Sequence, residues 1–238
     1  MRAGLAWQQS LFDGGAPRLD ASFAGLERLQ LDESSWIDYC PSWLAGADGL
    51  FAELLGAADW GQRQVRMYDR LVLEPRLTAR FCTDVDDEST PGALVEITQK
   101  LSRRYDVRLD RVWVNLYRDG ADSVAWHGDR NAKVHRNPLV ATVSLGARRR
   151  FQLRPKGTTK VAHTLYPGHG DLVVMGGACQ HDWEHTVPKV AKAPGARMSV
   201  TIRHSRGELL PGVAADADFL GGRQFRTGGG SGRLSAAR

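Results

Sequence analysis

The sequence of 238 residues is 42% hydrophobic and 25% charged, with a formal net charge of +5. This composition is typical of a soluble globular chain, and no apolar run approaches the roughly 20 residues of a membrane span. The three cysteines, Cys40, Cys82 and Cys179, form no CxxC pair. Their spacing argues against a disulfide framework or a structural zinc site and favours a reducing, cytoplasmic compartment. The small positive charge is only a weak indication of a polyanionic partner.

The first third of the chain predicts a strand followed by a helix. We expect the strand around Leu29. The segment "WLAGADGLFAELL" predicts the helix, because Leu44, Phe51, Leu54 and Leu55 would share one helical face. Both elements precede the region in which strand signals become dense.

The segment "TPGALVEITQKLSRRY" gives a stronger helix signal. Thr90 can cap the helix, and Pro91 suits its first turn. Leu94, Ile97 and Leu101 then follow at helical spacing and predict a buried stripe. We therefore expect a second, amphipathic helix shortly before the strand-rich region.

From about Arg111 onward, short β-like runs alternate with turns. Eight such runs follow in order: "RVWVNLY", "SVAWHGD", "LVATVSLG", "RFQLRP", "HTLYPG", "GDLVVMGG", "DWEHTVP" and "RMSVTIRHS". Strands at this density predict a mostly β fold with flanking helices, built as a sandwich, barrel or jelly roll. After Ser205 the sequence becomes rich in Gly, Arg and Ala, which predicts a disordered tail.

A candidate metal site begins at His127 and Asp129 in "SVAWHGDRN". Residues i and i+2 of a strand point to the same face, so an imidazole and a carboxylate could reach one ion. In "QHDWEHTVPK", both His181 and His185 would lie on one face of an extended segment. Either histidine would complete the two-His-one-carboxylate set of non-haem Fe(II) oxygenases. A His-x-Asp pair also occurs by chance, so ordinary strand histidines remain an alternative.

The last predicted strand, "RMSVTIR", has one apolar and one polar face. The polar face carries two arginines and two hydroxyls, at Arg197, Ser199, Thr201 and Arg203. Buried arginines need anionic partners, because an unpaired buried charge costs several kcal/mol. A small dicarboxylate would satisfy both arginines. Alternatively, the arginines could pair with local Asp or Glu residues, or Arg203 could simply be exposed to solvent. The strand "RVWVNLY" adds Asn115 and Tyr117 on one face, where a structural role is the commoner case.

Taken together, these segments resemble the AlkB family of Fe(II)- and 2-oxoglutarate-dependent dioxygenases, especially its nucleic-acid demethylases. The resemblance runs from about Leu71 to Ser205 and rests on the order of "EPRLTARF", "NLYRDGADSVAWHGD", "VATVSLGARRRFQLRPKG", "GDLVVMGG", "WEHTVPK" and "RMSVTIR". It implies a double-stranded β-helix (jelly-roll) core over residues 106–205. Residues 1–105 would form an α/β extension with a nucleotide-recognition lid, and residues 206–238 a disordered tail.

The resemblance also implies the cofactors and the residues that hold them. His127, Asp129 and His185 match the family's Fe(II) ligands, and His185 is preferred to His181 because the family's distal histidine precedes a short x-x-Pro run, here ending at Pro188. With Fe(II) come 2-oxoglutarate as co-substrate and O2. The implied co-substrate contacts are Asn115, Tyr117, Arg197, Ser199, Thr201 and Arg203, with Ser199 standing where the family frequently has asparagine.

The implied reaction is oxidative demethylation of alkylated bases in DNA or RNA, with release of formaldehyde, succinate and CO2. Arg130 and Asn131 stand where the family commonly has an acidic residue that reads the damaged base, so the base preference is open. Arg76 and Phe81 are candidates for contacting the base by stacking, with core packing as the alternative for Phe81. Arg80 occupies a position that is often aromatic in the repair members.

Further readings stay open at this stage. A basic stripe could hold phosphates or could simply be an exposed barrel face; it comprises Arg148, Arg150, Gln152 and Arg154. A related oxygenase could act on a modified tRNA base, a protein or a small molecule, as the Arg130–Asn131 pair would allow. A catalytically silent jelly-roll binding module is a third possibility, against which the intact ligand set and both arginines argue. We expect a monomer, with no membrane and no protein partner.

Overall fold

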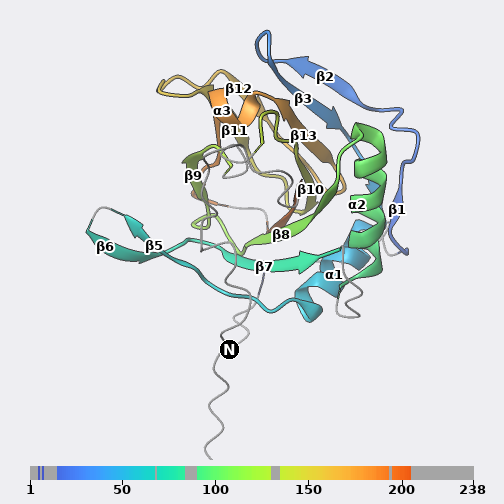
Figure 1. Cartoon of the computed structure of the whole chain (residues 1–238). Helices are drawn as coiled ribbons and strands as arrows, with labels where there is room; N and C mark the ends of the chain where they lie inside the picture. The colour runs from blue at the N-terminus through green and yellow to red at the C-terminus, as the bar shows by residue number, and fades with distance from the viewer. Residues whose placement is uncertain are drawn as a thin grey trace, which may run out of the picture.

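The computed structural model describes residues 5, 7, 15–67, 69–83, 90–129, 135–192 and 195–204. The predicted tail over residues 206–238 and the predicted base contacts Arg130 and Asn131 lie outside these residues. The described part is mostly β, and its two main sheets are antiparallel and face each other (Figure 1). This is the jelly-roll arrangement that the sequence predicts.

The larger sheet has seven strands in the order β2-β3-β13-β10-β15-β8-β7. In that order, their bounds are Glu27–Gln30, Ser35–Cys40, Leu172–Gly177, Val140–Gly146, Arg197–His204, Leu109–Tyr117 and Leu77–Cys82. The strands β2, β3 and β7 come from the first 105 residues, and β3 pairs directly with β13 while β7 pairs with β8. The N-terminal part of the chain therefore completes the sheet of the core.

The smaller sheet has four strands in the order β12-β11-β14-β9. In that order, their bounds are His163–Leu165, Phe151–Pro155, Trp183–Val187 and Val124–His127. All eight strands predicted from the run of β-like segments are therefore confirmed. The remaining strands are β1 and β4, at Arg18–Leu19 and Leu44–Ala45, and the hairpin of β5 and β6, at Gln64–Met67 and Arg70–Leu73.

Two helices, α1 (Ala47–Ala57) and α2 (Gly92–Tyr105), cover one side of the larger sheet (Figure 1). The apolar face of β15 packs into the core beneath them, since Met198, Val200 and Ile202 have no exposed surface. The alternation along β15 thus sends its polar residues to the opposite side, toward the smaller sheet. Among the described residues, none of the helices is both long and apolar enough to cross a membrane.

The predicted helices are correct in place but not in every detail. The first begins at Ala47, so Leu44 lies in β4 and not on the helical face. In α2 the buried stripe of Leu94, Ile97 and Leu101 is confirmed. The capping prediction for Thr90 is wrong: Pro91 occupies the N-cap position, and the Thr90 hydroxyl donates to the carbonyl of Cys82 at 3.4 Å instead. A tertiary hydrogen bond has replaced the local one.

Candidate active site

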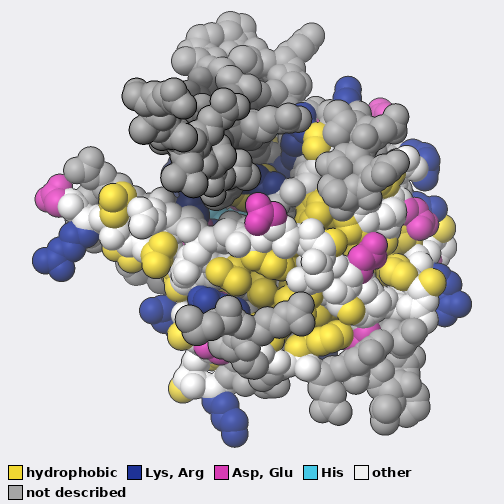
Figure 2. Space-filling view, turned by 90° about the horizontal axis from the view of Figure 1, so that it is seen from below, with side chains coloured by type: hydrophobic (Ala, Val, Ile, Leu, Met, Phe, Trp, Pro, Cys, Tyr) yellow, Lys and Arg dark blue, Asp and Glu magenta, His cyan; other side chains and the backbone are white. Residues whose placement is uncertain are grey.

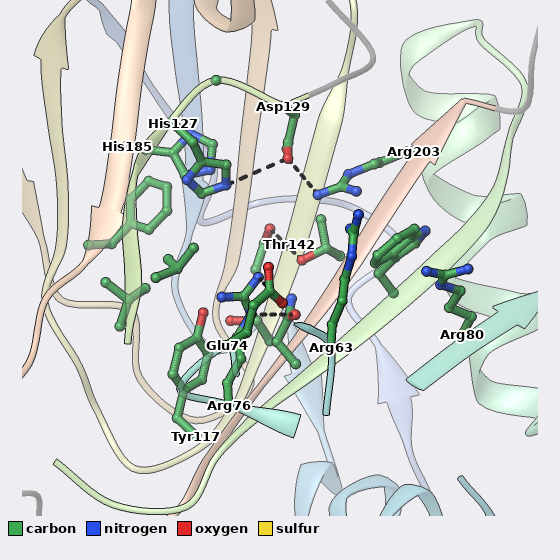
Figure 3. A pocket seen from close by; sticks show the side chains of 18 residues that line it. Arg63, Glu74, Arg76, Arg80, Tyr117, His127, Asp129, Thr142, His185 and Arg203 are labelled. Atoms are coloured by element: carbon green, nitrogen blue, oxygen red, sulfur yellow. Dashed lines mark hydrogen bonds and ion pairs between the residues drawn. The ribbon is translucent and has the colours of Figure 1, made fainter. Parts of the chain in front are cut away.

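Two histidines lie side by side on neighbouring strands of the smaller sheet. The strands β14 and β9 pair so that His185 lies directly opposite His127, and their ring centroids are 4.3 Å apart. Asp129 follows two residues beyond the end of β9, so the expected i, i+2 strand geometry does not apply to it. The candidate ligand atoms of His127, Asp129 and His185 nevertheless all lie within 4.8 Å of one another (Figure 3). The sequence therefore predicted the convergence correctly but for a partly wrong reason.

The other candidate histidine is elsewhere. His181 belongs to a short helix, α3 (Cys179–Asp182), so the segment is not extended as expected. Its Nε2 lies 3.1 Å and 3.0 Å from the carbonyl oxygens of His135 and Arg136. The structure therefore groups His185, and not His181, with the other two residues.

Asp129 and His185 are in the protonation states that metal binding needs. Burial raises the pKa of Asp129, but the nearby charges, chiefly that of Arg203, outweigh it and the pKa ends below its usual value. Burial lowers the pKa of His185 to about 3, which keeps the ring neutral. The Nδ1 of His127 lies 2.8 Å from the carbonyl of Ala125, and because a carbonyl only accepts, the proton sits there and Nε2 is left as the ligand atom.

Asp129 also has a free oxygen. Arg203 Nη2 donates to its Oδ1 at 2.6 Å, and its backbone N–H donates to Gln180 Oε1 at 2.8 Å. The buried Oδ2 takes no hydrogen bond within the described part of the chain. Because buried polar atoms are nearly always satisfied, this orphaned oxygen is available to bind a cation.

Gly128 separates two of the candidate ligands and tolerates no side chain. A Cβ there would lie 2.6 Å from the carbonyl oxygen of Gln180. We expect Gly128→Ala to shift Asp129 and weaken Mn(II) binding by about 10- to 100-fold, the usual cost of disturbing ligand orientation. A fluorescence titration measures this, with Gly92→Ala as the control because a Cβ at Gly92 meets nothing within 4 Å. Equal Mn(II) affinity in both variants would contradict the expectation.

A cavity of about 250 Å³ opens beside the three residues. Its walls include most of the polar residues that the sequence singled out: Asn115, Tyr117, Ser199, Thr201 and Arg203. The reason is strand register, since β15 pairs with β8 so that Ser199 lies opposite Asn115 and Arg197 opposite Tyr117. The polar faces of two neighbouring strands therefore form one surface.

Arg197 lies behind this surface as a buried cation. It is 1% exposed and donates to the hydroxyls of Ser199 and Ser144, the latter at 3.0 Å. Its guanidinium lies 5.4 Å from the ring centroid of Tyr117. Burial lowers the pKa of Arg197, and among the described residues no carboxylate bonds it and its Nε has no partner. An anionic ligand would supply what this guanidinium lacks.

The structure adds Arg149, which the sequence did not single out. It is buried and donates to three backbone carbonyls, those of Asp119 at 2.9 Å, Asp122 at 3.0 Å and Pro188 at 2.8 Å. These bonds tie the β8–β9 connection to the residue that follows β14, so they hold together the two strands that carry the histidines. Within "ARRRF" no pattern distinguishes this arginine from its exposed neighbours.

Of the two predicted base contacts that the structure describes, Arg76 lines the cavity and Phe81 does not. Arg76 lines the cavity, but it is bonded to the wall, with Nε donating to Asn115 Oδ1 at 3.1 Å and Nη2 pairing with Glu74 at 3.2 Å. Phe81 packs against the core beneath the helices and does not line the cavity. The alternation of β7 explains this, because Phe81 lies on the face opposite to Arg80, which does line it. A stacking role for Phe81 is therefore corrected to core packing.

The predicted basic stripe is also only partly available. Arg154 pairs with Glu184 at 2.8 Å and lies over the ring of Trp126 at 4.2 Å. Arg148 and Arg150 precede β11, and so do not lie on its face as expected. For Arg154, the exposed-face reading is favoured over phosphate binding.

Comparison with known proteins decides the family. Residues 82–203 match the 2OG-Fe(II) oxygenase superfamily. Over 208 residues the chain is 32% identical to the bovine (Bos taurus) alpha-ketoglutarate-dependent dioxygenase alkB homolog 3, covering 79% of this chain and 70% of that protein. The protein is an AlkB-like 2OG-Fe(II) oxygenase.

Other relatives of this AlkB-like oxygenase belong to the same family. The human alkB homolog 3 is 31% identical over 66% of this chain and 61% of its own length. The DNA oxidative demethylase ALKBH2 of Arabidopsis thaliana is 33% identical over 60% of this chain and 57% of its own length. The solved structure of OsALKBH1 has the same fold, with a TM-score of 0.55 at 14% identity over 75% of this chain and all of that one.

Membership makes this AlkB-like protein an Fe(II)- and 2-oxoglutarate-dependent dioxygenase, with O2 as its oxidant. The residues present fit these groups. A ligand set of two imidazoles and one carboxylate with a free oxygen suits Fe(II). The buried guanidinium of Arg197, which lacks an anion in the described structure, suits a carboxylate of 2-oxoglutarate.

Proposed function

We propose that the protein removes N-alkyl groups from bases in nucleic acid by oxidative demethylation. The observation that carries the proposal is that His127, Asp129 and His185 converge and line one cavity, whose wall also carries Asn115, Tyr117, Ser199, Thr201 and Arg203. The relatives support the substrate class, since those from bovine and plant sources are named an alkB homolog and a DNA oxidative demethylase. DNA and RNA are both candidate substrates.

We propose the following roles for the site. His127, Asp129 and His185 hold Fe(II), and Arg203 fixes the orientation of the Asp129 carboxylate through its 2.6 Å hydrogen bond. We assign the binding and orientation of 2-oxoglutarate to the six predicted contacts: Asn115, Tyr117, Arg197, Ser199, Thr201 and Arg203. Fe(II), 2-oxoglutarate and O2 bound there would supply the oxidant for hydroxylation of the N-alkyl carbon, with succinate and CO2 as co-products, and the resulting carbinolamine would release formaldehyde.

The chain's further contribution is to orient the base and exclude water. Apolar side chains of Val124, Phe151 and Val187 line the cavity beside the histidines, where they keep bulk water from the reacting carbon. A base inside a duplex cannot reach this cavity, so the substrate must be single-stranded or flipped out.

The lid proposed within residues 1–105 would include the β5–β6 hairpin, which projects beyond the sheets (Figures 1 and 2). Leu71, Val72 and Leu73 on this hairpin are exposed large hydrophobic residues. Arg63, Glu74 and Arg76 connect the hairpin to the cavity that they help to line. An exposed apolar hairpin beside a cavity suits contact with unstacked bases.

We also propose that the protein is cytoplasmic. Cys40 and Cys179 are buried free thiols, and burial raises the pKa of Cys179 to about 12. Such protonated thiols resist oxidation and need no oxidising compartment.

The test uses the purified full chain with Fe(II), 2-oxoglutarate and oligonucleotides that each carry one defined N-methyl lesion. We expect formaldehyde and succinate in equal amounts and a product mass lower by one CH2. Succinate formation that no lesion stimulates would contradict the nucleic-acid assignment and favour another substrate. No 2-oxoglutarate turnover at all would contradict the proposed function outright.

Arg203→Lys should raise the KM for 2-oxoglutarate by about tenfold or more, since a lost hydrogen bond to a charged group costs about 1.5–3 kcal/mol. Arg203 bonds Asp129 through Nη2, while its buried Nε has no partner among the described residues. A single ammonium cannot bond the metal ligand and the co-substrate from the same two positions. Steady-state kinetics measure the effect, with Arg154→Lys on the outer face as the control. An unchanged KM would remove Arg203 from the co-substrate contacts.

A further inference from the structure

A single carboxylate remains at the cavity once Asp129 is assigned to the metal. Among the described residues that line the cavity, Glu74 and Asp129 are the only acidic ones. Glu74 lies in the connection between β6 and β7, on the same wall as Arg63 and Arg76 (Figure 3). No local pattern selects Glu74, because nothing marks a glutamate between a hairpin and a proline.

The backbone holds Glu74 in place. Its N–H donates to the carbonyl of Arg63 at 2.8 Å, and its own carbonyl accepts from the N–H of Arg76 at 2.8 Å and from Gln62 Nε2 at 2.9 Å. Its side chain is 16% exposed. The carboxylate is therefore a fixed feature of the wall and not a mobile surface group.

Only one of its two oxygens is engaged. Arg76 Nη2 lies 3.2 Å from Oε2, whereas Oε1 takes no hydrogen bond from the part of the chain that the structure describes. Arg76 is itself held by Asn115 Oδ1 and by the carbonyl of Ser123. The Glu74–Arg76 pair is thus anchored to the wall and presents one free acceptor oxygen beside the cavity.

The charge around Glu74 determines what such an acceptor can do. Arginines at four positions, Arg63, Arg76, Arg80 and Arg203, line the same cavity. A methyl group on the ring nitrogen of cytosine or adenine leaves a cationic ring with an exocyclic amino donor. That ring would be repelled by the arginines unless a carboxylate balanced its charge and accepted its N–H.

Resting on the proposed function, we propose that Glu74 determines base specificity by selecting cationic, amino-bearing N-methylated bases over neutral ones. Oε1 accepts the hydrogen bond from the exocyclic amino group, while Oε2 stays paired with Arg76. A neutral base with a carbonyl at that position has no donor to offer and places oxygen against oxygen. The preference against the neutral base is expected to be large, because binding that base would leave the Glu74 oxygen and the base carbonyl without hydrogen-bond partners.

The test compares 3-methylcytosine with 3-methylthymine in the same single-stranded oligonucleotide. Both carry a methyl group on the same ring nitrogen, but only the first is cationic and has an amino group. In Glu74→Gln we expect the ratio of kcat/KM for 3-methylcytosine to that for 3-methylthymine to fall by roughly 10- to 100-fold, the effect of losing one charge-assisted hydrogen bond. Glu74→Asp keeps the charge and should retain a larger ratio than Glu74→Gln.

The matched control is Glu184→Gln, the same change at a glutamate that pairs with Arg154. Its ratio should equal that of the wild type. If wild type demethylates and the ratio in Glu74→Gln is unchanged, or falls only together with a higher KM for 2-oxoglutarate, Glu74 merely supports Arg76 and the inference is overturned. If the wild type releases formaldehyde from neither lesion nor from any other methylated base, the proposed function itself fails and the inference falls with it.

Discussion

His127→Ala is expected to abolish formaldehyde release and to weaken Mn(II) binding by at least about 100-fold, since even changes outside a ligand set cost about 10- to 100-fold. His127 supplies one of the three converging ligand atoms, and its Nδ1 bond to Ala125 aims Nε2 at the other two. Its side chain is 36% exposed, so its loss should leave the fold largely intact. Activity and metal binding should therefore fall together while Tm changes little.

Two further alanine substitutions sharpen this prediction. His185→Ala should behave like His127→Ala, because His185 lies opposite His127 on the neighbouring strand and belongs to the same cluster. His181→Ala should remain near wild type in both measurements, since His181 lies outside the ligand cluster and its Nε2 contacts backbone carbonyls of the loop that precedes β10. Loss of Mn(II) binding in His181→Ala, or its retention in His185→Ala, would reverse the ligand assignment.

How much of this site was predictable depends on whether each residue lies in a regular strand. Alternation alone correctly placed Ser199, Thr201 and Arg203 on one cavity wall, because β15 is a regular strand with a fully buried apolar face. The same rule failed for Asp129, which lies beyond the end of β9, and for His181, which lies in α3. Local periodicity therefore holds only as far as the element that carries it.

Residues positioned by tertiary contacts left no signal in the sequence. Arg149 is flanked by two other arginines, yet only its side chain turns inward to three backbone carbonyls. Glu74 becomes a wall residue because the β6–β7 connection passes the cavity, which no local pattern indicates. Phe81 shows the opposite error, since an aromatic residue near a predicted site was simply part of the core.

The buried arginines also show that function and stability make opposite demands on this fold. Arg149 is satisfied by three carbonyls, whereas Arg197 is bonded only to neutral hydroxyls among the described residues. The first arrangement is a structural clamp. The second leaves a buried charge that becomes well compensated only when an anion arrives.

Arg197→Met should therefore stabilise the ligand-free protein while it destroys co-substrate binding. Replacing a buried, uncompensated ion by an apolar side chain is often neutral or stabilising by about 1–4 kcal/mol. A gain of 1 kcal/mol raises Tm by about 2–4 °C in a chain of this size. The affinity for 2-oxoglutarate should fall by at least about 30-fold, since removing one partner of a buried charge pair costs about 2–5 kcal/mol.

Arg149→Met is the matched control, because the same substitution there leaves three backbone carbonyls without their donor. Each unsatisfied buried group costs about 1–3 kcal/mol, so Tm should fall. Thermal unfolding with Mn(II), with and without 2-oxoglutarate, separates the two: the ligand should raise the Tm of the wild type and leave that of Arg197→Met unchanged. A lower Tm in both variants would mean that Arg197 is structural as well, and the anionic ligand would then have to be held by Arg203 alone.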